Sequence, residues 1–171
     1  MLNASLMLID NAPRRVFAFL SVACLTMLAF GLYLQHSKGL EPCPMCIVQR
    51  YALFAVALVA GVLSASASKR VHFLGSFVLL LAAGFGAFVA ARQSWLQWYP
   101  PEVATCGRDF YGMIESFPLN RAIPMIFKGS GDCSAIDWTF LGGSIANWAF
   151  LVFAATVLLA LLMLGRRWTR H

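Results

Sequence analysis

Residues 43–63 have the sequence CPMCIVQRYALFAVALVAGVL, in which two cysteines stand at the beginning of an apolar run. The run over residues 47–63 is long enough to cross the hydrocarbon core of a membrane as a helix. Two thiols separated by two residues, Cys43 and Cys46, can close a small, strained ring that is easily reduced. The segment therefore predicts redox chemistry at a membrane surface.

The composition of the whole chain indicates an integral membrane protein. Of its 171 residues, 60% are hydrophobic and 12% are charged, and the mean hydropathy is +0.74. Four runs are long enough to span a membrane, at about residues 16–35, 47–63, 71–91 and 145–164. Each must be helical, since backbone groups in lipid have to bond within their own segment and no alternating strand pattern is present. We expect an all-α membrane protein, a single domain over residues 1–171 built on a four-transmembrane-helix bundle.

The distribution of charge predicts the orientation of this bundle. Seven cations lie on the side that also holds both termini: Arg14, Arg15, Lys69, Arg70, Arg166, Arg167 and Arg170. The opposite side, with loops at about residues 36–46 and 92–144, carries an excess of acidic residues. Since positive charges stay in the cytoplasm, both termini are expected there and the cysteine pair is expected outside. The net charge of +6 thus follows from topology, and no nucleic-acid binding is expected.

The long outer loop, at about residues 92–144, contains four prolines and many apolar residues. Long loops are usually functional or disordered, and the apolar content argues against disorder. We expect a short helix that lies on the membrane surface and is interrupted by prolines. Alternatively, the apolar side chains only pack back onto the bundle.

Four of the five cysteines face outward in this topology, and Cys24 lies within the first apolar run, where a lone thiol is most often a packing residue. Four outer cysteines can pair in three ways, and proximity favours Cys43 with Cys46 and therefore Cys106 with Cys133. Both pairs could be bridges that merely brace the loops, although so small a ring as the first stabilises little. A zinc site is disfavoured because the second two cysteines are 26 residues apart, and no metal is expected.

Arg50 follows Cys46 by four residues. If the helix begins near Cys46, the two side chains share a face one turn apart. The helix N-terminus and the guanidinium would then both stabilise a Cys46 thiolate, and the guanidinium should be the larger contribution. The alternative is an interfacial arginine that reaches toward lipid phosphates.

Three ordered motifs along the chain resemble those of a known family. They are Glu41-Pro-Cys-Pro-Met-Cys-Ile-Val-Gln-Arg50, Leu96-Gln-Trp-Tyr-Pro100 leading to Ala104-Thr-Cys106, and Gly129-Ser-Gly-Asp-Cys133 followed by Trp138 and Phe140-Leu-Gly142. Together they resemble the DsbB family, the thiol:quinone oxidoreductases of the bacterial inner membrane that reoxidise the soluble thiol oxidase DsbA. The resemblance covers nearly the whole chain and implies an enzyme of disulfide bond formation, with its redox cysteines in the periplasm.

The resemblance also implies a role for each outer cysteine. Cys106 would be attacked by the reduced partner, a DsbA-like soluble oxidase of thioredoxin fold, and this would free Cys133. Cys133 would then attack Cys43 and release Cys46 as a thiolate. A membrane quinone, ubiquinone or menaquinone, would accept the electrons beside Cys46, with Arg50 holding both in place.

Gln93 stands where well-known members of that family carry a histidine, just before the Leu-Gln-x-Tyr-Pro stretch. A glutamine can still donate a hydrogen bond to a quinone oxygen but cannot carry a charge. Gln93 is therefore expected to line the quinone site.

Two other functions compete with the enzyme hypothesis. One is a disulfide-braced membrane scaffold or docking protein without redox turnover. The other is a transporter of thiol equivalents, which would need reactive cysteines reachable from both sides, whereas Cys24 is the only cysteine within an apolar run.

Overall fold

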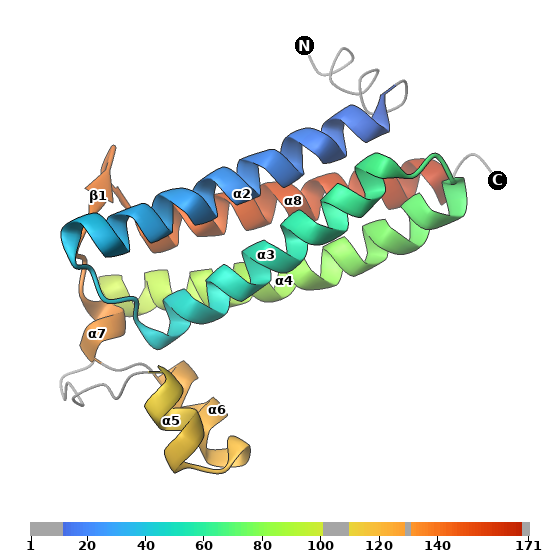
Figure 1. The fold of residues 1–171 in the computed structure, drawn as a ribbon. Coiled ribbons are helices and arrows are strands. Elements are labelled where there is room, and N and C mark those ends of the chain that lie inside the picture. The colour runs from blue at the N-terminus through green and yellow to red at the C-terminus, as the bar shows by residue number, and fades with distance from the viewer. Residues whose placement is uncertain (1–11, 101–109, 129–130, 169–171) are drawn as a thin grey trace.

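The computed structural model describes residues 12–100, 110–128 and 131–168, and these residues fold around four long helices. The helices are α2 (Pro13–Lys38), α3 (Pro44–Ala65), α4 (Lys69–Trp98) and α8 (Ile145–Trp168). Within the described part of the chain, these four are long and apolar enough to span a membrane. They pack side by side as a bundle, and the beginning of α2 and the end of α8 lie at the same end (Figure 1). The predicted fold class is confirmed, and the chain is a multi-pass membrane protein.

The core of the bundle is built from three helix pairs, α2 with α3, α3 with α4, and α4 with α8. Small and branched apolar side chains such as Val56, Leu63 and Leu79 fill it together with the rings of Phe17 and Phe153, whereas other aromatic side chains such as Phe19 and Phe85 face outward. At Gly86 of α4, an added Cβ would collide with the ring of Phe153 on α8. The missing side chain thus lets α4 and α8 approach closely.

Helices α2 and α3 are joined by polar contacts along their whole length. At one end, Arg14 Nε donates to the carbonyl oxygen of Ser64 at 2.8 Å. In the middle, Ser21 Oγ donates to the carbonyl oxygen of Ala57 at 2.8 Å. At the other end, Arg50 of α3 donates to side-chain and backbone oxygens of α2. In an apolar environment such hydrogen bonds hold neighbouring helices together.

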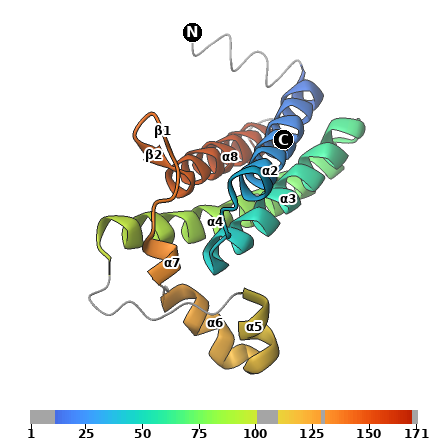
Figure 2. The same cartoon turned by 60° about the vertical axis from the view of Figure 1, so that its left-hand side comes forward.

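The segment between α4 and α8 contains three short helices, α5 (Phe110–Ser116), α6 (Leu119–Lys128) and α7 (Gly131–Ser134). They lie at the end of the bundle where α3 begins and α4 ends, with α7 between the bundle and α6 (Figure 2). Helix α6 is amphipathic and continues through Pro124. Ala122 and Ile126 are buried, while Ile123 and Met125 are exposed. The segment therefore packs onto the bundle with one face and leaves an apolar face uncovered.

A small hairpin precedes α8 and was not predicted. Strands β1 (Thr139–Phe140) and β2 (Gly143–Ser144) pair in antiparallel register. The two residues between them have positive φ, 49° at Leu141 and 79° at Gly142, as in a type I′ turn. The indole Nε1 of Trp148 on α8 donates to the carbonyl oxygen of Phe140 at 3.0 Å and holds the hairpin on the bundle.

Candidate active site

The first turn of α3 carries Cys43 and Cys46. Cys43 is the N-cap, and its sulfur accepts a hydrogen bond from the backbone N–H of Cys46 at 3.2 Å. Pro44 occupies the first helical position, where its missing N–H costs nothing and its fixed φ suits the helix. The helix thus begins three residues before the apolar run itself. Both sulfurs consequently lie at a helix N-terminus, where a negative charge is favoured.

Gln93 of α4 faces both of these sulfurs. Its Nε2 donates to Cys43 Sγ at 3.3 Å and to Cys46 Sγ at 3.2 Å. Its Oε1 accepts a hydrogen bond from Nε2 of Gln49 at 2.6 Å. This contact depends on the length of α4, because the helix continues to Trp98 although the apolar run ends at about residue 91.

Cys133 reaches the same cluster from α7. It is fully buried and its side chain is hydrogen-bonded with Cys43. Apolar side chains from three helices surround the sulfurs, with Met45 from α3, Val89 from α4 and Ile126 from α6. The structure thus joins three of the predicted site residues, Cys43, Cys46 and Cys133, in one buried cluster.

The cluster distinguishes the two sulfurs of the close pair. Hydrogen bonds to Cys133 and to Cys46, together with burial, raise the pKa of Cys43 well above its ordinary value. Cys43 therefore keeps its proton when a negative charge is present in the cluster. The sulfur of Cys46 accepts a hydrogen bond from the neutral amide of Gln93, as that of Cys43 also does, and it is hydrogen-bonded with Cys43.

Arg50 lies one turn beyond Cys46 on α3, but its hydrogen bonds go to α2. Nη1 donates to Oε1 of Gln35 at 2.6 Å, and Nη2 donates to the carbonyl oxygen of Gly31 at 3.3 Å. Within residues 12–100, 110–128 and 131–168, no hydrogen bond connects the guanidinium with Cys46. The stabilisation of Cys46 by Arg50 therefore stays a prediction that depends on their spacing along the helix.

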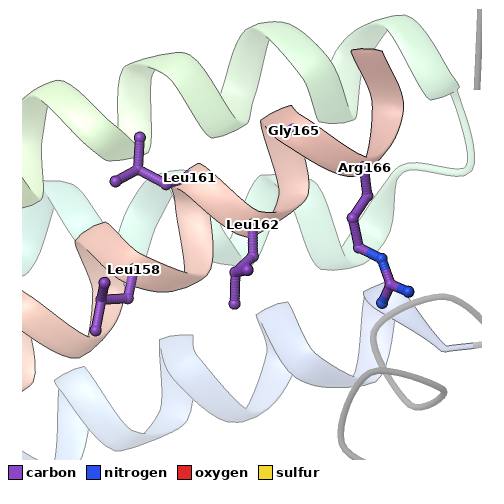
Figure 3. A pocket seen from close by; sticks show the side chains of 5 residues that line it. All are labelled: Leu158, Leu161, Leu162, Gly165 and Arg166. Atoms are coloured by element: carbon purple, nitrogen blue, oxygen red, sulfur yellow. The ribbon is translucent and has the colours of Figure 1, made fainter. Parts of the chain in front are cut away.

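Of the two remaining cysteines, the structure describes only Cys24. Cys106 lies outside the described residues. Cys24 is buried in the middle of the bundle among Phe17 and other core side chains, as expected for a packing residue. A hollow on the lipid-facing side of α8, lined by Leu158, Leu161, Leu162, Gly165 and Arg166, lies at the opposite end of the bundle (Figure 3). It is therefore separate from the sulfur cluster.

Gln49 is a site residue that the sequence analysis did not predict. It is 6% exposed, and its hydrogen bond to Gln93 links it to the sulfurs. A signal was present, because a polar residue inside an apolar span is costly and usually marks a functional position.

The donors around the cluster suit a quinone. Arg50 is half-buried. Its guanidinium has five N–H donors, and the two hydrogen bonds to α2 use two of them. Gln93 donates its amide hydrogen bonds to the two sulfurs, so it lies on the side of the site that carries the thiols. A quinone has carbonyl oxygens that accept hydrogen bonds and an apolar ring, so it matches these donors and their apolar surroundings.

Comparison with known proteins gives close relatives over nearly the whole chain. The family model described as "Disulfide bond formation protein DsbB" matches residues 13–163. A "Disulfide bond formation protein B" from Albidiferax ferrireducens is 69% identical over 163 residues, which cover 95% of this chain and 94% of the relative. Proteins of the same name from Acidovorax sp. (strain JS42) and Azoarcus sp. (strain BH72) are 69% and 56% identical, covering 93% and 90% of this chain and 92% and 94% of the relatives.

Proposed function

Because the chain belongs to the DsbB family of thiol:quinone oxidoreductases, which form disulfide bonds by reoxidising DsbA, we propose that the sulfur cluster at the start of α3 carries its electrons. The chain forms a single membrane domain in the bacterial inner membrane, with both termini in the cytoplasm. The cluster then lies on the periplasmic side, where a DsbA-like oxidase of thioredoxin fold reaches the outer loop. The side on which the cations gather supports this orientation.

The relay begins at the outer pair. The thiolate of the reduced partner attacks Cys106, the bond between Cys106 and Cys133 breaks, and Cys133 leaves with the electron pair. Cys133 next attacks Cys43 of the oxidised close pair, a bond between these two sulfurs forms, the bond between Cys43 and Cys46 breaks, and Cys46 leaves as a thiolate. The contact between Cys133 and Cys43 is the observation that carries this proposal, because an attacking sulfur must approach its target closely.

Arg50 and Gln93, together with Cys46, form the side of the cluster that holds the quinone, ubiquinone or menaquinone. When bound, the quinone supplies the two-electron acceptor chemistry that amino-acid side chains lack. Arg50 offers a fixed charge on the same face as Cys46, and Gln93 holds the sulfurs in place. In the reduced cluster Cys43 keeps its proton, because its pKa is raised, whereas in the relay its sulfur is bonded to Cys133 while the charge resides on Cys46.

Trapping the intermediate tests the order of the relay. In a Cys106→Ser variant with Cys43 and Cys46 oxidised to a disulfide, the free thiolate of Cys133 should attack Cys43, the bond between Cys43 and Cys46 breaks, and a disulfide between Cys43 and Cys133 forms. Mass spectrometry of the unreduced, digested protein measures the linked peptides. The matched Cys106→Ser, Cys43→Ser double variant, which has no disulfide for Cys133 to attack, should give far less linkage, and linkage of Cys133 to Cys46 in place of Cys43 in the first variant would refute the order.

Turnover separates the enzyme from a scaffold. When the purified protein is mixed with a reduced DsbA-like partner and ubiquinone, the quinone absorbance should fall as the quinone is reduced. A well-folded protein that leaves the absorbance unchanged would favour the disulfide-braced scaffold.

A further inference from the structure

Two buried carboxamides form a directed pair beside the sulfurs. Gln49 on α3 is 6% exposed and Gln93 on α4 is 4% exposed. Gln49 Nε2 donates to Gln93 Oε1 at 2.6 Å, so this oxygen is turned away from the sulfurs. The Nε2 of Gln93 is left facing Cys43 and Cys46, at 3.3 and 3.2 Å.

We infer that Gln49 is a positioning residue, which fixes the carboxamide of Gln93 so that its N–H donor faces the thiolate of Cys46. The inference rests on the proposed function, in which Cys46 leaves with the electron pair. A carboxamide has a donor end and an acceptor end of almost the same shape. Without a partner for Oε1, it could turn over and present this oxygen to the negative sulfur.

The pair stabilises the thiolate without using a titratable group. A hydrogen bond from an N–H group to an ionised acceptor is about twice as strong as one between neutral groups. A histidine donor would gain or lose charge near neutral pH, whereas a glutamine does not. The contribution of Gln93 to the stability of the thiolate is consequently the same on both sides of about pH 6.5, the ordinary pKa of histidine.

The test measures the reactivity of Cys46 in reduced protein, in lipid nanodiscs without quinone. Iodoacetamide alkylates the thiolate, so its rate as a function of pH gives a titration midpoint. Trypsin releases the peptide from Gly39 to Arg50, and its fragment ions distinguish label on Cys46 from label on Cys43. Thermal unfolding identifies the variants that fold.

Each variant changes one member of the pair formed by Gln49 and Gln93. Gln93→Leu removes the donor and should move the midpoint up by about one pH unit, a tenfold smaller thiolate fraction. Gln49→Met frees the carboxamide and should move it up by about half a unit, or threefold, because the thiolate itself still favours the N–H orientation. Gln49→Glu should have the largest effect, since a carboxylate accepts from Nε2 and turns Oε1 toward the sulfurs.

The control is Gln97→Leu, on the same helix. Gln97 accepts from Ser144 Oγ at 2.6 Å and has no bond to the sulfurs, so its variant should keep the wild-type midpoint. A folded Gln49→Glu protein with the wild-type midpoint would overturn the inference. If that variant does not fold, Gln49→Met decides, and a midpoint equal to that of Gln97→Leu would overturn it.

Failure of the inference and failure of the relay give different results. If the relay order is wrong, the linkage between Cys43 and Cys133 is missing in the trapping experiment, but the Gln49 variants still shift the midpoint. If the positioning is wrong, the linkage forms and the midpoints stay the same.

Discussion

Replacement of Arg50 by methionine separates the two roles that the structure allows for this side chain. The guanidinium holds α2 through Gln35 and Gly31, and it places a charge one turn from Cys46. Side chains at positions i and i+4 have Cβ atoms about 6 Å apart. At an effective dielectric constant of about 20, two unit charges at this distance interact by about 3 kcal/mol. This value corresponds to an effect of about 100-fold.

Gln35→Leu is the matched variant, because it removes the hydrogen bond at 2.6 Å and keeps the charge. Loss of a hydrogen bond to a charged group costs about 1.5–3 kcal/mol of stability, so both variants should unfold at lower temperature. The rate of electron transfer should differ between them. We expect Arg50→Met to lose at least about tenfold and Gln35→Leu to lose no more than about threefold.

Rapid mixing of the reduced protein with ubiquinone measures this rate through the loss of quinone absorbance. Arg70→Met, at the exposed opposite end of the bundle, controls for the loss of one positive charge. Equal slowing by Gln35→Leu and Arg50→Met would show that Arg50 acts only by holding α2. An unchanged rate in Arg50→Met would refute both roles in electron transfer.

Three further predictions follow from packing and from the sulfur cluster. Cys24→Ala should cost about 1 kcal/mol of stability and leave turnover within about twofold, as measured by thermal unfolding and quinone reduction; a folded but inactive variant would contradict the packing role. Gly86→Ala should destabilise the bundle by about 1–3 kcal/mol through overpacking, whereas Gly84→Ala, with no atom within 4 Å of its added Cβ, should not, and equal unfolding temperatures would contradict this. The hydrogen bond with Cys133 raises the pKa of Cys43, so Cys133→Ala should lower that pKa and move the alkylation profile of Cys43 to lower pH; a shift to higher pH would show that Cys133 does not raise the pKa of Cys43.

The bundle could be predicted from the sequence because apolar length is a strong and local signal. Four apolar runs correspond to four helices, and the charges that flank them indicate the expected sidedness. The ends of the helices follow weaker signals. Helix α4 continues past Ala91 through polar residues that are buried at the end of the bundle, and hydropathy alone ends the segment too early.

The candidate site could be predicted only in part, because its contacts join residues that lie far apart in the sequence. The close pair of cysteines is visible as a motif, but the approach of Cys133 depends on how α7 folds back onto α3 and α4. The direction of Arg50 toward Gln35 depends on the packing of α2, which spacing along one helix does not determine. The bond between Gln49 and Gln93 joins residues 44 positions apart, and no local pattern indicates it.

The three polar contacts between α2 and α3 fix the register of this helical hairpin. A slip of one helical turn, about 5.4 Å, would break the contacts of Arg14, Ser21 and Arg50 together. Piston-like sliding of α2 is therefore an improbable way of opening or closing the route for electrons. In the proposed relay, the spans would then act as a stationary frame for thiols carried by the segment outside the bundle.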